Sequence, residues 1–242
     1  MFEIYRETAI GDVVAHDLRT AAVFSRFAID FCCGGRRTVE DACIAAHLDP
    51  DRVVRDLRAV HEDPASAGDL TAWPAARLID RIVTRHHAYV RGQTPIIAGY
   101  LAKLRAKHGD RHVELARLAA IFADVSDELR RHIDKEERIL FPAIAALADD
   151  YEHGTAPDAF GRSIRQPIAV MEDEHQWAGA QLTLMRTLSH DYAVPPQGCA
   201  TWKACYAALE DFEKDLQQHV HLENNVLFPL ARRLGEALKA TA

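Results

Sequence analysis

Two segments of this chain are near copies of each other, and each carries a histidine and a glutamate four residues apart. One runs from His132 to Pro142 and the other from His219 to Pro229, and both read H-x-x-x-E-[EN]-x-[IV]-L-F-P. Residues four apart lie about 40° apart around an α-helix, so each histidine points the same way as its glutamate. Two such helices facing each other would bring two imidazoles and two carboxylates into one interior. This arrangement is the basis of a two-metal site.

The remaining sequence predicts an all-α protein, because apolar residues recur at helical spacing and no segment alternates convincingly. We expect four long helices at about 76–107, 111–149, 161–190 and 199–238. Short breaks between long helices indicate antiparallel neighbours, hence an up-down-up-down four-helix bundle. Pro142 and Pro229 lie inside apolar runs that continue beyond them, so we expect kinks rather than helix ends there.

The N-terminal part reads as a separate small helical domain. Short helical patterns occur at 9–16, 20–27, 38–46 and 51–61, and the sequence Cys32-Cys33-Gly34-Gly35 interrupts them with a turn. Residues 61–68 are rich in helix breakers. We therefore predict a small domain at 1–62, a linker at 63–75 and the bundle at 76–242.

Composition excludes several classes of function. The chain is 48% hydrophobic and carries a formal net charge of −7, and its longest apolar runs are too short to span a bilayer. We expect no signal peptide, and the acidic balance argues against nucleic-acid binding. Five cysteines that include an adjacent pair make a poor disulfide framework. Reduced thiols in the cytoplasm fit this pattern better.

The repeat extends to two further histidines. His87 precedes His132 by 45 residues, and His175 precedes His219 by 44. With Glu136 and Glu223, the set comprises four histidines and two glutamates. Imidazole and carboxylate together suit iron, manganese or zinc, and a glutamate can bridge two metals. Two carboxylates in a core need cations, whereas any one of these histidines alone would be read as an ordinary core or surface residue.

The choice of ligand on the first long helix is open between two neighbours. The apolar stripe of that helix centres on His86, whereas the repeat spacing favours His87. We take His87 as the ligand and expect His86 to support a ligand or to face solvent. Each ligand histidine needs an acceptor for its other ring nitrogen, and Glu174 and Glu137 are candidates.

These features resemble the haemerythrin-like di-iron proteins known as the repair-of-iron-centres family. The resemblance covers nearly the whole chain. It is carried by the Cys-Cys-Gly-Gly turn, by His87 eight residues before Pro95, and by three further segments: 170–175, 201–203 and 222–229.

The resemblance implies a cofactor of two iron ions, non-haem and bridged by oxo and carboxylate groups. The implied metal ligands are the following six residues: His87, His132, Glu136, His175, His219 and Glu223. Respiratory haemerythrins carry a further histidine four residues after the third-helix ligand, where this chain has Gly179. That difference would leave a coordination position open for a small ligand.

The resemblance also implies repair of iron–sulphur clusters damaged by nitric oxide or oxidative stress, with NO or O2 as the small ligand. An enzymatic activity consistent with the resemblance is the two-electron reduction of two NO molecules to nitrous oxide, with Glu174 as the proton carrier. Cys32 and Cys33 would act in thiol exchange or iron transfer, with damaged iron–sulphur proteins as partners.

Several alternatives stay open at this stage. The vicinal cysteines could simply be small residues at a tight turn. The protein could bind or sense NO or O2 without catalysis, or it could be a metal-free structural bundle. Manganese or zinc could replace iron, and the chain could form a homodimer.

Overall fold

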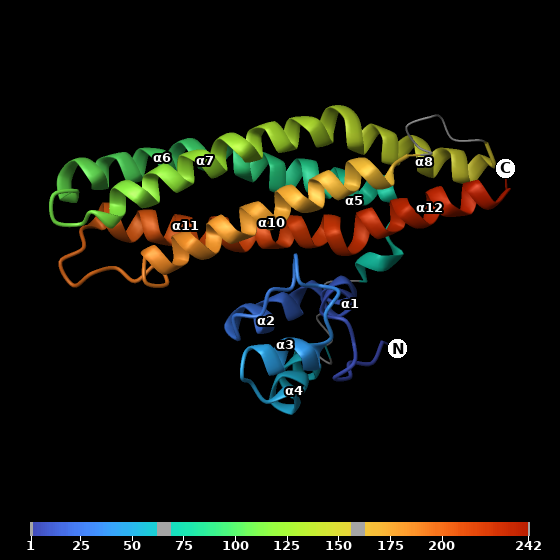
Figure 1. Cartoon of the computed structure of the whole chain (residues 1–242), viewed down its shortest axis with the longest axis horizontal. Helices are drawn as coiled ribbons and strands as arrows, with labels where there is room; N and C mark the ends of the chain where they lie inside the picture. The colour runs from blue at the N-terminus through green and yellow to red at the C-terminus, as the bar shows by residue number, and fades with distance from the viewer. Residues whose placement is uncertain (1, 62–68, 156–162, 242) are drawn as a thin grey trace. The chain divides into compact units, whose positions relative to one another are not determined.

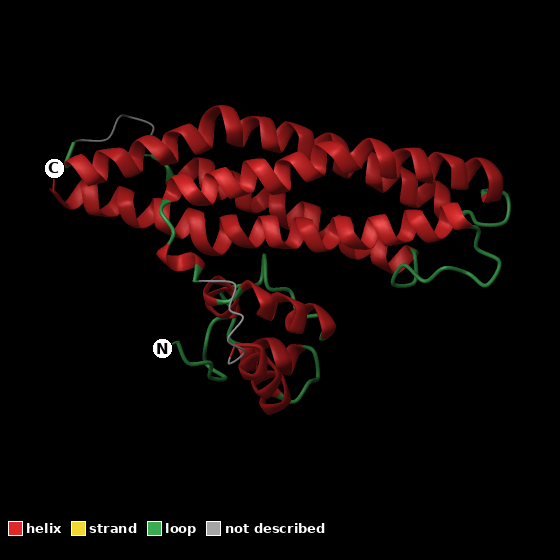
Figure 2. Ribbon diagram, turned by 180° about the vertical axis from the view of Figure 1, so that it is seen from behind, coloured by secondary structure: helices red, strands yellow, loops and turns green. Residues whose placement is uncertain are grey.

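The computed structural model describes residues 2–61, 69–155 and 163–241, and within these ranges the chain is helical with no strand (Figure 2). The only extended pairing among them is an isolated bridge between Ala9 and Thr38. The predicted all-α class is therefore confirmed. Part of the predicted linker (63–68) and the start of the third predicted long helix (161–162) lie outside the described residues.

The chain divides into two compact units, each of which is described by itself. The first comprises Met1–Ile79, Ile144–Arg165 and Gln217–Ala242, and the second comprises Asp80–Ala143 and Gln166–Leu216. Helix α5 (Ala75–Arg81) and helix α11 (Ala200–Leu222) each contribute residues to both units.

The second unit is a helical bundle built on α6 (Ala88–His108), α7 (Glu114–Lys135), α10 (Arg165–Leu188) and the first part of α11 (Figure 1). Phe212 of α11 packs against Phe122 of α7 and near Tyr89 of α6, with ring centroids 5.5 and 6.4 Å apart. Arg186 of α10 binds Glu213 of α11. These contacts join all four helices around one apolar core.

The first unit holds the N-terminal helices together with the C-terminal end of the chain. Its elements are α1 (Ile10–His16), η1 (Leu18–Thr20), α2 (Ala21–Arg26), α3 (Val39–Ala45), α4 (Pro50–His61), η2 (Leu70–Ala72), the first part of α5, most of α8 (Phe141–His153), the end of α11, η5 (Glu223–Leu227) and α12 (Phe228–Thr241). Thr38 caps α3 because its side chain accepts from the Asp41 amide at 3.0 Å. The N-terminal helices share a core of fully buried apolar residues: Ile10, Val14, Phe24, Val39 and Leu57.

In the described parts of the chain, three π-helical turns interrupt the long helices: η3 (Ile82–His87), η4 (Glu136–Leu140) and η5 (Glu223–Leu227). Pro142 and Pro229 each lie two residues after the end of a π turn, and the helix continues through both prolines. A proline ring excludes the regular bond to the carbonyl four residues back, and a wider turn accommodates that loss. The π turns also hold His87, Glu136 and Glu223, and helix periodicity gave no sign of them.

Candidate metal centre

Four of the six expected ligands converge in the second unit. Glu136 is fully buried, and its two carboxylate oxygens lie 3.3 Å from His87 Nε2 and 3.2 Å from His132 Nε2. His175 Nε2 lies 3.0 Å from His132 Nε2. The elements η3, α7, η4 and α10 therefore present three imidazoles and one carboxylate to the same interior point.

The outward ring nitrogens of two of these histidines are held by carboxylates. His87 Nδ1 lies 2.8 Å from Glu137 Oε1, and His132 Nδ1 lies 2.7 Å from Glu174 Oε2. Arg91 in turn binds Glu137 at 2.7 Å, and Lys135 binds Glu174. Carboxylates that orient metal-binding imidazoles in this way fix the ring and its tautomer.

Both orienting carboxylates stay ionised. Hydrogen bonds from Arg91 and then from His87 hold the pKa of Glu137 below its ordinary value. Hydrogen bonds from His132 and then from Lys135 lower the pKa of Glu174 to about 2. An ionised carboxylate only accepts, so the Nδ1 atoms of His87 and His132 carry the protons.

This tautomer decides which ring nitrogen is available to bind a metal ion. With its proton on Nδ1, a neutral imidazole presents a bare lone pair at Nε2. When these imidazoles are neutral, the Nε2 atoms of His87 and His132 meet the carboxylate oxygens of Glu136 lone pair against lone pair, and a cation between them would relieve the repulsion. The donor set of nitrogen and carboxylate oxygen suits iron, manganese or zinc.

The other two expected ligands lie together in the first unit. His219 and Glu223 are fully buried, and His219 Nε2 lies 2.9 Å from Glu223 Oε1. They sit at the end of α11 and the start of η5, one helical turn apart. The second copy of the repeat therefore forms the same histidine–glutamate pair as the first.

His86 is neither exposed nor directed at this cluster. It is fully buried, and its Nδ1 lies 3.0 Å from Asp215 Oδ1 on α11. His87, one residue on, contacts Glu136. The geometry within the second unit therefore favours His87 over His86 as the first-helix ligand.

The two cysteines form a tight turn in the first unit. Asp30 Oδ1 accepts from the backbone amides of Cys32 and Cys33, each at 3.0 Å, and lies 3.2 Å from Cys32 Sγ. The two sulfurs are 3.9 Å apart. The carboxylate and both sulfurs lie within 4.8 Å of one another, a grouping that could hold a metal ion. The contact with Cys33, followed by burial, raises the pKa of Cys32 well above its ordinary value, so Cys32 is a protonated thiol at neutral pH.

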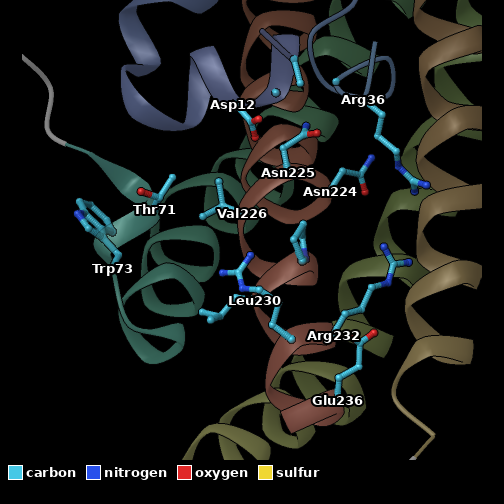
Figure 3. Close-up of a pocket in the computed structure, with 15 residues that line it drawn as sticks. Asp12, Arg36, Thr71, Trp73, Asn224, Asn225, Val226, Leu230, Arg232 and Glu236 are labelled. Carbon is cyan, nitrogen blue, oxygen red and sulfur yellow. The ribbon is translucent and has the colours of Figure 1, made fainter. Parts of the chain in front are cut away.

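This dicysteine turn lies against the π turn η5 that begins with Glu223. Asn225 Nδ2 donates to Cys32 O at 3.0 Å and is 3.4 Å from Phe31 O. His221, two residues after His219, is also fully buried, and its ring lies 5.9 Å from that of Phe31. Beside Asn225 opens a cleft of about 590 Å³ lined by residues that include Gly11, Gly35 and Trp73 (Figure 3). The spacing of the sequence predicts no role for His221 or for Asn225.

Glu174 and Gly179 are two further residues to which the sequence analysis assigns a role. Glu174 is engaged by His132 and Lys135, and a carboxylate with a pKa of about 2 is better suited to orienting His132 than to carrying protons at neutral pH. Gly179 lies on α10 one turn after His175 and is half-buried.

A helical bundle with buried histidines and glutamates at this spacing defines a non-haem metal protein of the haemerythrin class. The Hemerythrin HHE cation binding domain matches residues 78–231, a range that contains all six expected ligands. A second family model, ScdA_N, a domain of unknown function (DUF542), matches residues 6–61 and hence the dicysteine turn.

The chain is also similar over nearly its full length to proteins named iron-sulfur cluster repair protein YtfE. That of Musicola paradisiaca (strain Ech703) is 38% identical, covering 96% of this chain and 99% of the relative. Those of Yersinia pseudotuberculosis serotype O:1b (strain IP 31758) and Yersinia pestis (strain Pestoides F) are 36% and 35% identical, each covering 95% of this chain and 98% of the relative. The chain therefore belongs to the family of iron–sulphur cluster repair proteins with a haemerythrin-like domain. Membership implies a di-iron centre, and the buried cluster has the ligands to hold metal.

Among the described residues, no helix combines the length and the apolar character needed to cross a membrane.

Proposed function

We propose that this protein repairs damaged iron–sulphur clusters, using a di-iron centre together with the thiols of Cys32 and Cys33. The relatives that cover the chain almost completely carry this function in their names. The observation that carries the proposal here is the hydrogen bonding of the dicysteine turn to η5, the π turn that begins with the ligand Glu223. A protein that only held iron would have no need of thiols at that place.

In this proposal, the six ligand residues expected from the sequence hold one pair of iron ions. His87, His132, His175 and His219 would each donate a ring nitrogen, and Glu136 and Glu223 would bridge the ions. This assignment is supported by the repeated sequence, by the family model that spans all six residues, and by the complete burial of both glutamates. The domain division at 1–62 and 76–242 belongs to the same proposal.

Bound iron would supply coordination positions and electrons to a small ligand, and the chain's own residues would do the rest. Glu137 and Glu174 hold two imidazoles in the metal-binding tautomer, while Arg91 and Lys135 keep those carboxylates ionised. Cys32 keeps its proton until a metal or an acceptor displaces it. The turn is therefore suited to taking up iron on demand rather than to standing as a permanent thiolate.

Nitric oxide or O2 is the small ligand that we propose for the centre, because Gly179 carries no side chain where respiratory haemerythrins have another histidine. We place the protein in the cytoplasm, where the thiols of its five free cysteines would stay reduced. Association into a homodimer is part of the same proposal and is tested by sedimentation of the iron-loaded chain.

The direct test is recovery of a dehydratase whose iron–sulphur cluster has been damaged by nitric oxide. Iron-loaded protein is added without oxygen, and the dehydratase activity is followed against free ferrous iron at the same concentration. We expect faster recovery with the protein than with free iron, and slower recovery with Cys32→Ser/Cys33→Ser. Equal recovery with the protein and with free iron would refute the proposed function.

A further inference from the structure

The side chain of Asn225 is inserted into the dicysteine turn. Its Nδ2 donates to the carbonyl oxygen of Cys32 at 3.0 Å, is 3.4 Å from that of Phe31, and lies 3.2 Å from His221 Nδ1. Two of these three contacts are to the backbone of the turn itself. One side chain thus ties the dicysteine backbone to η5.

The rest of the carboxamide fills a notch made by two glycines. A Cβ added at Gly11 would lie 2.5 Å from Asn225 Oδ1, and one added at Gly35 would lie 2.2 Å from it. The two glycines are joined to each other, because the Gly11 amide donates to Gly35 O at 2.8 Å. Glycine at both positions therefore lets the carboxamide approach the turn this closely.

The groups that surround this side chain favour asparagine over residues of similar shape or chemistry. Aspartate has nearly the same shape, but it would set a carboxylate oxygen against the carbonyls of Phe31 and Cys32 and provide no donor. Buried acceptors that lose their donor carry the full cost of desolvation. Glutamine would supply the donor but would place it one methylene farther from its own backbone than asparagine does.

The first copy of the repeat provides a natural comparison. The residue two positions after Glu136 is Arg138, which is exposed, whereas the residue two positions after Glu223 is Asn225. The helical frame of the repeat therefore does not require asparagine at this position. What distinguishes the second copy is the turn bound to it.

We infer that Asn225 is a positioning residue: its carboxamide seats the Cys32-Cys33 turn on the π turn that carries Glu223, and this seating couples the thiols to the metal centre. The inference rests on the proposed function for the role of the thiols, whereas the seating itself follows from the contacts. Without the contacts of the Asn225 carboxamide, both the thiols and the metal ligands would remain, but they would act separately.

The test uses the full-length, iron-loaded chain in four forms: unaltered, Asn225→Asp, Gly35→Ala and Arg138→Ala. Asn225→Asp removes the donor, Gly35→Ala fills the notch, and Arg138→Ala is the matched change in the first copy. The first readout is the rate at which iodoacetamide alkylates each cysteine, followed by mass spectrometry. Cys205, which is fully buried in the second unit, reports general unfolding.

We expect Asn225→Asp and Gly35→Ala to speed alkylation of Cys32 about tenfold, as for the loss of one buried hydrogen bond, while Cys205 stays protected. Arg138→Ala should leave both rates unchanged. Bound iron should stay the same in all four forms. An unchanged alkylation rate at Cys32 in both Asn225→Asp and Gly35→Ala would show that Asn225 does not hold the turn in place. A parallel rise in the alkylation rate at Cys205 would contradict the proposal as well.

The second readout is recovery of a nitric-oxide-damaged dehydratase per iron supplied. We expect it to fall about tenfold in the two seat variants and to stay unchanged in Arg138→Ala. Full recovery by a variant whose Cys32 has become reactive would overturn the coupling. If the unaltered chain itself gives no recovery, the proposed function and the coupling both fail, and the alkylation result still decides the seating.

Discussion

The two copies of the repeat carry the same histidine and glutamate but have different surroundings. In the first copy, His132 and Glu136 are followed by the ionised Glu137 and the exposed Arg138. In the second, His219 and Glu223 are accompanied by the buried His221 and by Asn225, which binds the dicysteine turn. The shared positions are those expected to hold metal. The differing positions make different contacts: in the first copy Glu137 orients the imidazole of His87, and in the second Asn225 binds the backbone of the dicysteine turn.

The largest effect should come from the residues that the copies share. Removal of either carboxylate that is proposed to bridge the ions, in Glu136→Ala or Glu223→Ala, should reduce anaerobically loaded iron from about two ions per chain to less than half of that. Both variants should behave alike, because both carboxylates are proposed to serve one centre. Iron is measured by elemental analysis, and a large loss in only one variant would break the equivalence of the copies.

A smaller effect should follow from loss of the orienting carboxylates of the second unit. Glu174→Ala leaves His132 Nδ1 without its acceptor, and Glu137→Ala does the same to His87. Each should weaken iron binding about 10- to 100-fold, as measured by competition with a chelator. Glu128→Ala is the control, because it removes a carboxylate on α7, the helix that carries His132, and that carboxylate binds the exposed Arg131. Unchanged affinity in both orienting variants would mean that these hydrogen bonds do not tune the site.

Glycine substitutions should have opposite effects on stability in the two units. Gly35→Ala places a Cβ against Asn225 and should lower the free energy of unfolding by about 1–3 kcal/mol. Gly99→Ala lies in α6 with no atom within 4 Å of the added Cβ, and it should raise that free energy by up to about 1 kcal/mol. Urea unfolding of the metal-free chains measures both. Equal effects would show that the notch is not closely packed.

The smallest effect should come from Arg138→Ala. This exposed side chain corresponds in position to Asn225, and its loss should change the free energy of unfolding by less than about 0.5 kcal/mol. Thermal unfolding and iron content together check this expectation. A loss of iron would show that the first copy has a function at this position that its exposure does not suggest.

Local spacing in the sequence was enough to predict the helical class and the histidine–glutamate pairs. His87 was preferred over His86 from the repeat, and in the structure it is His87 that contacts Glu136. The notch around Asn225 could not be found in this way, because Gly11, Gly35 and Asn225 come from distant segments. The π turns were missed for a different reason: the apolar pattern alone does not distinguish them from regular helix.

The central claim is that residues from both copies hold one pair of iron ions. It is tested most directly by the low-temperature Mössbauer spectrum of the air-oxidised, iron-loaded chain in an applied magnetic field. We expect two ferric ions that are antiferromagnetically coupled, with a diamagnetic ground state, and loss of that signal in Glu223→Ala. Two magnetically isolated ferric ions, or a coupled pair that survives in Glu223→Ala, would contradict it.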